Sequence, residues 1–332
     1  MPFAVLRLLF RPLLLLMLFA GMALPASAQQ ANPLDSVVRV TSTVSRDSNS
    51  AAGLGTTREG HGVVIDGKGL VLTIGYLILE ASEVRLETGD GKTVPAEVVA
   101  YDYDSGFGMV RAIGPLPVPP MKLGDSSAAN VMDRVLVAGA GGRASTIGAE
   151  IVSRRTFAGY WEYLIDGALF TTPPHRDWGG AALINNKGEL IGIGSLFVRD
   201  TVPGEGTKPG NMFVPINLLK PIMADMLATG RAPGKPRPWV GINSQEVQNM
   251  VVVTNLSSRG PAATAGVLPG DIIVSVGKTR VQNQIDFYRT LWSQGDAGTQ
   301  IELRIMRDGK TLDFKIPSGS RYDVLKQGGS SL

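Results

Sequence analysis

Cysteine is absent from the 332-residue chain, and histidine occurs only twice, at positions 61 and 175. Without a thiol the chain forms no disulfide, carries no lipid-modified N-terminal cysteine and builds no thiolate metal site. Two isolated histidines also lack the ligand spacing that is typical of a zinc site. The sequence therefore predicts neither a metal nor a cofactor.

Charge is also sparse, since Asp, Glu, Lys and Arg together make up 18% of the residues. The 32 basic side chains exceed the 29 acidic ones by only three, which gives a formal net charge of +3. The chain shows no basic stripe interleaved with aromatic residues, the pattern expected of a nucleic-acid-binding surface. The sequence thus gives no support to a role with nucleic acid.

The chain lacks a hydrophobic run long enough to span a bilayer, although residues 1–28 are strongly apolar. Arg7 and Arg11 precede an apolar run over 13–24, and the small residues 26–28 (Ala-Ser-Ala) provide a cleavage site. A membrane-spanning helix needs about 20 apolar residues, and this run is shorter. We therefore expect a cleaved secretory signal peptide and a periplasmic or secreted protein.

Short strands dominate the expected structure between residues 29 and 230. Apolar runs alternate with glycine-rich turns at intervals typical of an all-β barrel or sandwich. Strands and hairpins are predicted over 36–42, 61–75, 83–102, 107–114, 134–142, 148–157 and 160–172. One helix is expected over 217–230, with Gly230 at its end.

A second, smaller unit begins after a proline-rich stretch over 231–238, which predicts an extended linker. Residues 239–317 alternate apolar strands with a short helix and predict a compact α+β domain. The stretch 318–332 has little apolar content and is expected to form a loose tail.

The second unit contains the segment SSRGPAATAGVLPGDIIVSVGKTRV (257–281). In it a short helix is followed by a Pro-Gly turn and by a strand that begins at Asp271. Together with the loop WVGI, which comprises Trp239, Val240, Gly241 and Ile242, it resembles a PDZ domain of the bacterial type. In such domains the backbone N–H groups of this loop bind a terminal carboxylate, and the neighbouring strand edge accepts an added strand. The resemblance implies a peptide groove whose side-chain pocket is lined by Phe287 and Leu291.

Three motifs in the first unit, GHGVVIDGKGLVLTIGYLIL, YDYDSGFGMVRA and HRDWGGAAL, resemble those around the catalytic triad of the HtrA/Deg proteases. The resemblance covers about residues 34–317 and implies a mainly β protein, a trypsin-like double β-barrel followed by a PDZ domain. The matching positions for the catalytic histidine, aspartate and serine are Tyr76, Gly106 and Trp178. All three triad residues are therefore expected to be replaced.

Acyl transfer by a triad needs a hydroxyl nucleophile, an imidazole base and an orienting carboxylate, and these three replacements supply none of them. His61 is expected to be a surface or partly packed residue. A relocated arrangement of Ser195, His175 and Asp177 is conceivable, but His175 and Asp177 lie too close in sequence to orient one another well. Tyr76 and Trp178 are expected to pack together and seal the former cleft, with ligand binding there as the alternative.

The sequence therefore predicts an HtrA-like pseudoprotease that acts as a binding scaffold in envelope protein quality control. Its expected partners are C-termini or exposed strands of envelope proteins, or an active HtrA relative, while the possibility of a homo-oligomer stays open. Two alternatives are a serine endopeptidase, the function that whole-chain similarity implies, and a holdase-type chaperone.

Overall fold

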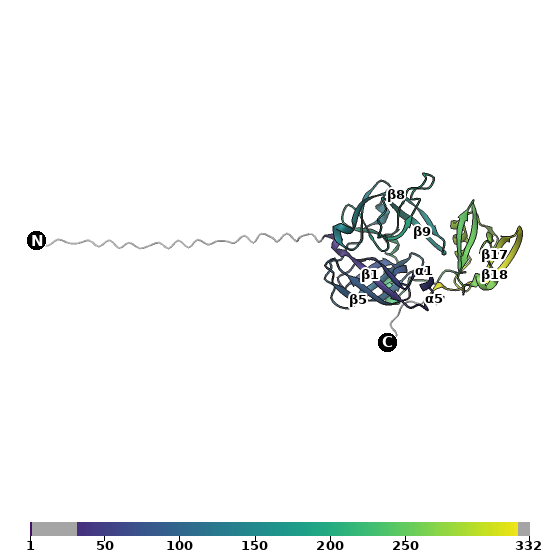
Figure 1. Ribbon diagram of the computed structural model, residues 1–332, viewed down its shortest axis with the longest axis horizontal. Helices are drawn as coiled ribbons and strands as arrows, with labels where there is room; N and C mark the ends of the chain where they lie inside the picture. Colours follow the sequence, from purple (N-terminus) through teal and green to yellow (C-terminus); the bar gives the residue numbers. More distant parts are fainter. Residues whose placement is uncertain (2–31, 325–332) are drawn as a thin grey trace. The chain divides into compact units, whose positions relative to one another are not determined.

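The computed structural model describes Met1 and residues 32–324 (Figure 1). The expected signal peptide, apart from Met1, therefore lies outside the described residues, as do residues 325–332. No helix in the described part of the chain is long and apolar enough to cross a membrane.

The first six strands close into an antiparallel barrel in the order β1-β2-β3-β6-β5-β4. Mostly aliphatic side chains form its core, and strand β3 is buried along its whole length. The tight β2–β3 turn is fixed by Asp66, whose carboxylate accepts the backbone N–H groups of Lys68 and Leu70 at 2.8 Å each. The strands are β1 (Val37–Val44), β2 (Thr57–Val64), β3 (Leu70–Ile74), β4 (Ala81–Glu87), β5 (Thr93–Tyr101) and β6 (Phe107–Ala112).

The next six strands form a second closed barrel in the order β10-β11-β12-β9-β8-β7. Closure pairs every strand on both sides, so neither barrel leaves a free edge. The long β8–β9 hairpin is the largest element of this barrel, and both of its strands are labelled in Figure 1. The strands are β7 (Arg134–Ala138), β8 (Thr146–Gly159), β9 (Tyr163–Thr172), β10 (Ala182–Ile184), β11 (Leu190–Val198) and β12 (Gly210–Pro215). The predicted mainly β class and trypsin-like double barrel are confirmed.

The helix expected over 217–230 is shorter than predicted. A 3₁₀ turn, η5 (Ile216–Leu218), precedes the α-helix α2 (Met223–Thr229). Pro221 separates the two, because it has no N–H and its ring excludes the preceding turn from an α-helix. Gly230 ends α2 in the left-handed conformation, with φ +78°. The remaining short helical pieces of the barrels are η1 (Pro33–Ser36), α1 (Ala51–Leu54), η2 (Gly75–Leu77), η3 (Ser126–Ala128) and η4 (Gly142–Ser145).

The third sheet follows the linker and has the order β13-β14-β15-β17-β18, with β16 beside β15. Helix α4 (Gln284–Trp292) buries Phe287, Tyr288 and Leu291 in the apolar cluster of this domain. Strand β13 lies at the edge of the sheet, so one side of its backbone is free of sheet partners. The elements are β13 (Ile242–Val247), β14 (Met250–Leu256), α3 (Pro261–Ala265), β15 (Ile272–Val276), β16 (Thr279–Arg280), β17 (Gln300–Arg307) and β18 (Lys310–Pro317).

The segment that follows β18 differs from the loose tail expected from Ser318. Gly319 forms an antiparallel bridge with Trp239, with backbone hydrogen bonds of 3.0 and 2.9 Å in both directions. Helix α5 (Arg321–Val324) comes next, and the Tyr322 ring packs edge-on against Tyr103 at 4.5 Å between centroids. The prediction is wrong for residues 318–324, because backbone pairing and an aromatic contact anchor a segment whose own apolar content is low.

Candidate functional site

The Gly179-Gly180 pair lies in the loop between β9 and β10, against strand β2. The carbonyl of Gly179 accepts the N–H of His61 at 2.8 Å, and the N–H of Gly180 donates to Gly194 at 2.8 Å. Gly180 has φ +76°, and a Cβ there would overlap the carbonyl of His61. Packing of the loop between two strands therefore demands glycine at this position, whatever the residue before it does.

Tyr76 and Trp178 are brought together beside this loop. The Tyr76 hydroxyl donates to the carbonyl of Ser195 at 2.9 Å. A Cβ on Gly179 would lie 2.8 Å from the Tyr76 hydroxyl oxygen. Burial raises the pKa of Tyr76 well above its usual range, while a hydrogen bond with the Trp178 side chain opposes this in part. The Trp178 ring also lies 5.8 Å from that of Phe197. The hydrogen bond between Tyr76 and Trp178 supports the expected packing of these two residues. The raised pKa keeps the Tyr76 phenol protonated at neutral pH.

Gly106 ends the turn before β6 with φ +78°, and its carbonyl accepts the N–H of Gly75 at 2.7 Å. The space beside it is filled by Tyr163, whose hydroxyl donates to the carbonyl of Ser105 at 2.8 Å. A Cβ on Gly106 would lie 2.7 Å from that hydroxyl oxygen. A phenol therefore occupies the place beside Gly106. The nearby carboxylate of Asp102 is used to fix the turn, because it accepts both the N–H and the hydroxyl of Ser105.

His61 is buried, with 5% of its surface exposed, in contrast to the surface or partly packed position expected for it. Its Nδ1 accepts the N–H of Ala140 at 3.0 Å, which ties β2 of the first barrel to the loop after β7. Burial lowers the pKa of His61 to about 4, with a smaller opposing effect of Asp177. The imidazole is therefore neutral at physiological pH and serves as a backbone acceptor.

His175 is equally buried, and both of its ring nitrogens have backbone partners. Nδ1 accepts the N–H of Asp177 at 3.1 Å, so Nε2 carries the proton that it shares with the carbonyl of Ser145 at 3.0 Å. The Ser195 side chain is instead a hydrogen-bond partner of Tyr163. The conceivable relay of Ser195, His175 and Asp177 is thus not formed. The described residues also hold no cluster of three or more potential metal ligands.

The loop at the start of the third domain binds a carboxylate that belongs to the chain itself. The backbone N–H groups of Val240, Gly241 and Ile242 donate to the Glu162 carboxylate at 3.3, 2.6 and 2.8 Å. Gly241 has φ +79°, which turns neighbouring N–H groups toward one point. Burial raises the pKa of Glu162, while the Arg321 guanidinium and the three N–H groups counteract this. The loop therefore has the geometry of the anion-binding nest that the resemblance to a PDZ domain implies.

The other predicted groove residues lie close to this loop. Phe287 and Leu291 are fully buried in one apolar cluster with Val240 and Ile242. The backbone of Trp239 pairs with Gly319. Among the described contacts, Trp239 forms no hydrogen bond with Glu162. The predicted pocket residues are thus together, whereas Trp239 serves as an anchor for the returning chain.

Glu162 and two residues of α4 were missed by the sequence analysis. The Tyr288 hydroxyl donates to the carbonyl of Gly159 at 2.7 Å and accepts the N–H of Glu162 at 3.2 Å. Gln284 donates to the carbonyl of Ser244 at 2.7 Å. The available signal was an acid between aromatic residues in the segment 160–163 (YWEY), which the pattern predicted as continuous strand. The structure turns there instead, with Glu162 at φ +53°.

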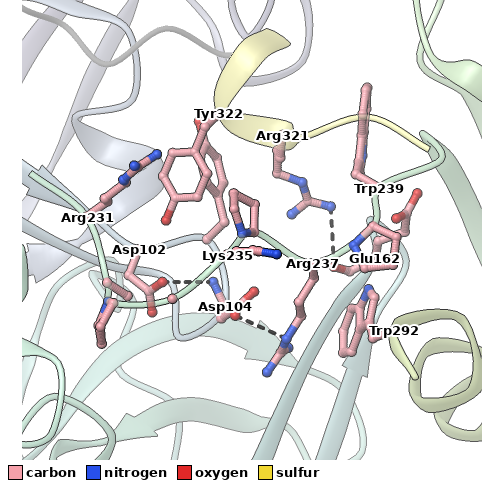
Figure 2. Close-up of a pocket in the computed structure, with 16 residues that line it drawn as sticks. Asp102, Asp104, Glu162, Arg231, Lys235, Arg237, Trp239, Trp292, Arg321 and Tyr322 are labelled. Carbon is pink, nitrogen blue, oxygen red and sulfur yellow. Dashed lines mark hydrogen bonds and ion pairs between the residues drawn. The ribbon is translucent and has the colours of Figure 1, made fainter. Parts of the chain in front are cut away.

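A second set of charged residues surrounds the linker (Figure 2). Arg237 pairs with Asp104 at 3.1 Å, and its guanidinium carbon lies 4.5 Å from the centre of the Trp292 ring. The Arg321 guanidinium donates to the carbonyl of Trp161 at 2.5 Å. These contacts hold the linker and the α5 segment against the barrel and the hairpin that carries Glu162.

Comparison with known proteins agrees with this architecture. Residues 60–193 match the trypsin-like peptidase domain, and residues 238–317 match the PDZ domain. The fold and domain content thus define a serine-protease-like double barrel joined to a PDZ domain. The chain is homologous to the HtrA/Deg proteases.

Curated relatives include a serine protease Do-like HtrA of Lactobacillus helveticus, with 25% identity over 79% of this chain and 69% of the relative. The periplasmic serine endoprotease DegP of Salmonella typhimurium is 27% identical over 80% of this chain, which spans 58% of that relative. Among solved structures, the HtrA-type protease AlgW with a tripeptide is 21% identical and has a TM-score of 0.52. That match covers 88% of this chain and 95% of AlgW, and it establishes the fold alone.

Proposed function

We propose that this protein is an exported, HtrA-like pseudoprotease that binds partner chains through its PDZ domain. One observation carries the proposal: Tyr76, Gly106 and Trp178 stand where the resemblance places the triad, and both histidines of the chain are bound elsewhere. Periplasmic relatives such as DegP support the expected location. The similarity to these periplasmic relatives is also the basis for a proposed role in envelope protein quality control.

The chemistry weighs against hydrolysis. Loss of a working triad lowers kcat by a factor of about 10⁶. Oxyanion stabilisation and binding alone leave a rate enhancement of about 10³- to 10⁴-fold over the reaction in water. In the described contacts neither imidazole is a hydrogen-bond partner of Ser195, because His175 bonds to Ser145 and Asp177 and His61 bonds to Ala140. Tyr76 is a protonated phenol at neutral pH and does not act as a general base.

The PDZ domain supplies the positive part of the proposal. Three convergent N–H groups at the start of the edge strand β13 suit a peptide with a free C-terminal carboxylate. The AlgW structures were solved with a tripeptide and a decapeptide. We extend peptide binding to this chain as part of the proposal.

The test of inactivity is a digest of casein and of a fluorogenic peptide by the purified protein, together with fluorophosphonate labelling. We expect no cleavage above the rate of a heat-denatured sample and no labelled serine. An active HtrA protease in the same assay controls for the substrate. A serine that labels in the native protein and not after denaturation would overturn the proposal.

Serine endopeptidase activity is the second candidate, because the curated relatives are named as proteases. It requires a nucleophile other than the residue before Gly179, which is Trp178 in this chain. Mass spectrometry of the labelled peptide would locate that nucleophile. A label at Ser195 would support this candidate directly.

A further inference from the structure

The tip of the β8–β9 hairpin, residues 159–162, contacts both strand β13 and helix α4, the two walls of the peptide groove that the resemblance implies. The Ser244 N–H of β13 donates to the carbonyl of Tyr160 at 2.8 Å. Two residues further along the hairpin, the Glu162 carboxylate takes the three N–H groups of the loop that precedes β13. A backbone carbonyl on the edge strand and a carboxylate in the nest are the contacts that an added peptide strand would make.

The opposite wall of the groove holds the same segment. The hydroxyl of Tyr288 on α4 binds both the carbonyl of Gly159 and the N–H of Glu162. Gln284, at the start of the same helix, also reaches the carbonyl of Gly159, at 3.3 Å. Both walls of the groove therefore hydrogen-bond to the hairpin tip.

The apolar part of the contact comes from strand β9, which follows the hairpin tip. Leu164, on β9, is 9% exposed and belongs to the apolar cluster of the PDZ domain. This cluster also contains Phe287 and Leu291, the two residues expected to line the side-chain pocket. Glu162 and Leu164 together thus present a carboxylate and an aliphatic side chain, which a peptide with C-terminal leucine would present on one residue.

We infer that Glu162 is an internal ligand of the PDZ groove, and that a partner with an apolar C-terminal residue must displace it in order to bind. The inference rests on the proposed peptide-binding function. It adds that the groove is closed by the chain's own hairpin and that the measured affinity is lowered by the fraction of closed molecules. The partner class is a chain with a free terminal carboxylate and an aliphatic last side chain.

Hydrogen exchange tests the internal ligand without any peptide. In the full chain, the amides of Val240, Gly241 and Ile242 are expected to exchange at least tenfold faster in the variant Glu162→Ala than in the wild type. Glu162→Gln keeps the shape of the side chain and weakens the acceptor, so an intermediate increase in the exchange rate is expected. This variant replaces Glu162→Ala if the alanine variant melts at a lower temperature. Glu97→Ala removes an exposed carboxylate on β5 and serves as the control.

Peptide affinity gives the second measurement. The probe is a fluorescein-labelled hexapeptide that ends in Tyr-Trp-Leu with a free carboxylate, and the same peptide with a C-terminal amide is its control. We expect the dissociation constant of the free-acid peptide to fall tenfold or more in Glu162→Ala and to be unchanged in Glu97→Ala. Charge-assisted hydrogen bonds to a carboxylate are strong enough for a change of this size.

The two measurements separate the two ideas. Faster exchange in Glu162→Ala with no peptide binding in any variant would keep the internal ligand and refute the proposed peptide function. Unchanged exchange, with equal carboxylate-dependent affinity in wild type and variant, would refute the internal ligand and keep the proposed function.

Discussion

Substitution of Gly106 by alanine tests whether the space that the resemblance assigns to the triad aspartate is closed. The backbone at Gly106 has φ +78°, a conformation that costs an L-residue about 1 to 2 kcal/mol. The new Cβ would also lie 2.7 Å from the hydroxyl of Tyr163. That hydroxyl belongs to a buried side chain held by Ser105, so relief requires a shift of packed atoms and costs about 1 to 3 kcal/mol more.

Gly91 provides a matched control within the same barrel. It has φ +84°, and a Cβ there would meet no atom within 4 Å. The variant Gly91→Ala therefore reports the backbone cost alone, about 1 to 2 kcal/mol. We expect Gly106→Ala to lower the free energy of unfolding by about 1 to 3 kcal/mol more than Gly91→Ala does.

Urea unfolding at 25 °C, followed by tryptophan fluorescence and by circular dichroism, measures both changes. A double-mutant cycle with Tyr163→Phe then locates the steric cost, because removal of the hydroxyl leaves room for the alanine. Equal destabilisation by Gly106→Ala and Gly91→Ala would show that the site is open. An absence of coupling with Tyr163 would refute the argument in the same way.

Three further outcomes are expected. The pKa of His61 is about 4 in the native state and 6.5 in the unfolded state, so the unfolded state binds a proton at higher pH. The free energy of unfolding therefore falls by about 3 kcal/mol as pH drops from about 6.5 to about 4. The variant His61→Gln should flatten this part of the plot of urea midpoint against pH, and parallel plots for variant and wild type would contradict the assignment. Trp178→Ser alone should leave the fluorogenic-peptide assay at background, since neither Tyr76 nor Gly106 supplies a base or a carboxylate, and a measurable rate would show that another base serves the new hydroxyl. Asp271 is 1% exposed and pairs with Arg307 through two hydrogen bonds of 2.6 Å, so Asp271→Asn should cost about 2 to 4 kcal/mol in a urea titration at pH 7, and a loss below about 0.5 kcal/mol would refute that role.

The elements that sequence alone predicted correctly are those whose cause is local. The β2–β3 turn follows from Asp66 and the glycines beside it, and the end of α2 follows from Gly230 in the left-handed conformation. The nest at Gly241, which the resemblance to a PDZ domain implies, likewise depends on backbone geometry within a few residues. Such signals lie within the reach of a short window of sequence.

The elements that sequence missed depend on partners far along the chain. Glu162 is stabilised by N–H groups 78 to 80 residues away, so its local pattern of aromatic neighbours gave only the signal of a strand. Gly319 is ordered by Trp239, which no tail composition could indicate. The expectation of a surface or partly packed His61 also failed, because its acceptor role depends on Ala140 in the other barrel.

The retention of a Gly-Gly pair after Trp178 has a physical explanation that does not involve catalysis. A Cβ on Gly180 would overlap the carbonyl of His61, and a Cβ on Gly194 would overlap the carbonyl of Trp178. These two glycines let the loop pass between β2 and β11, and the barrels lose their packing without them. The residue before the pair, Trp178, contributes a backbone carbonyl to these contacts, which accepts the N–H of Ala181 at 3.1 Å, and a carbonyl is available from any residue type. A protease-like motif therefore contains an architectural part and a chemical part, and the packing of this loop explains the first without reference to the second.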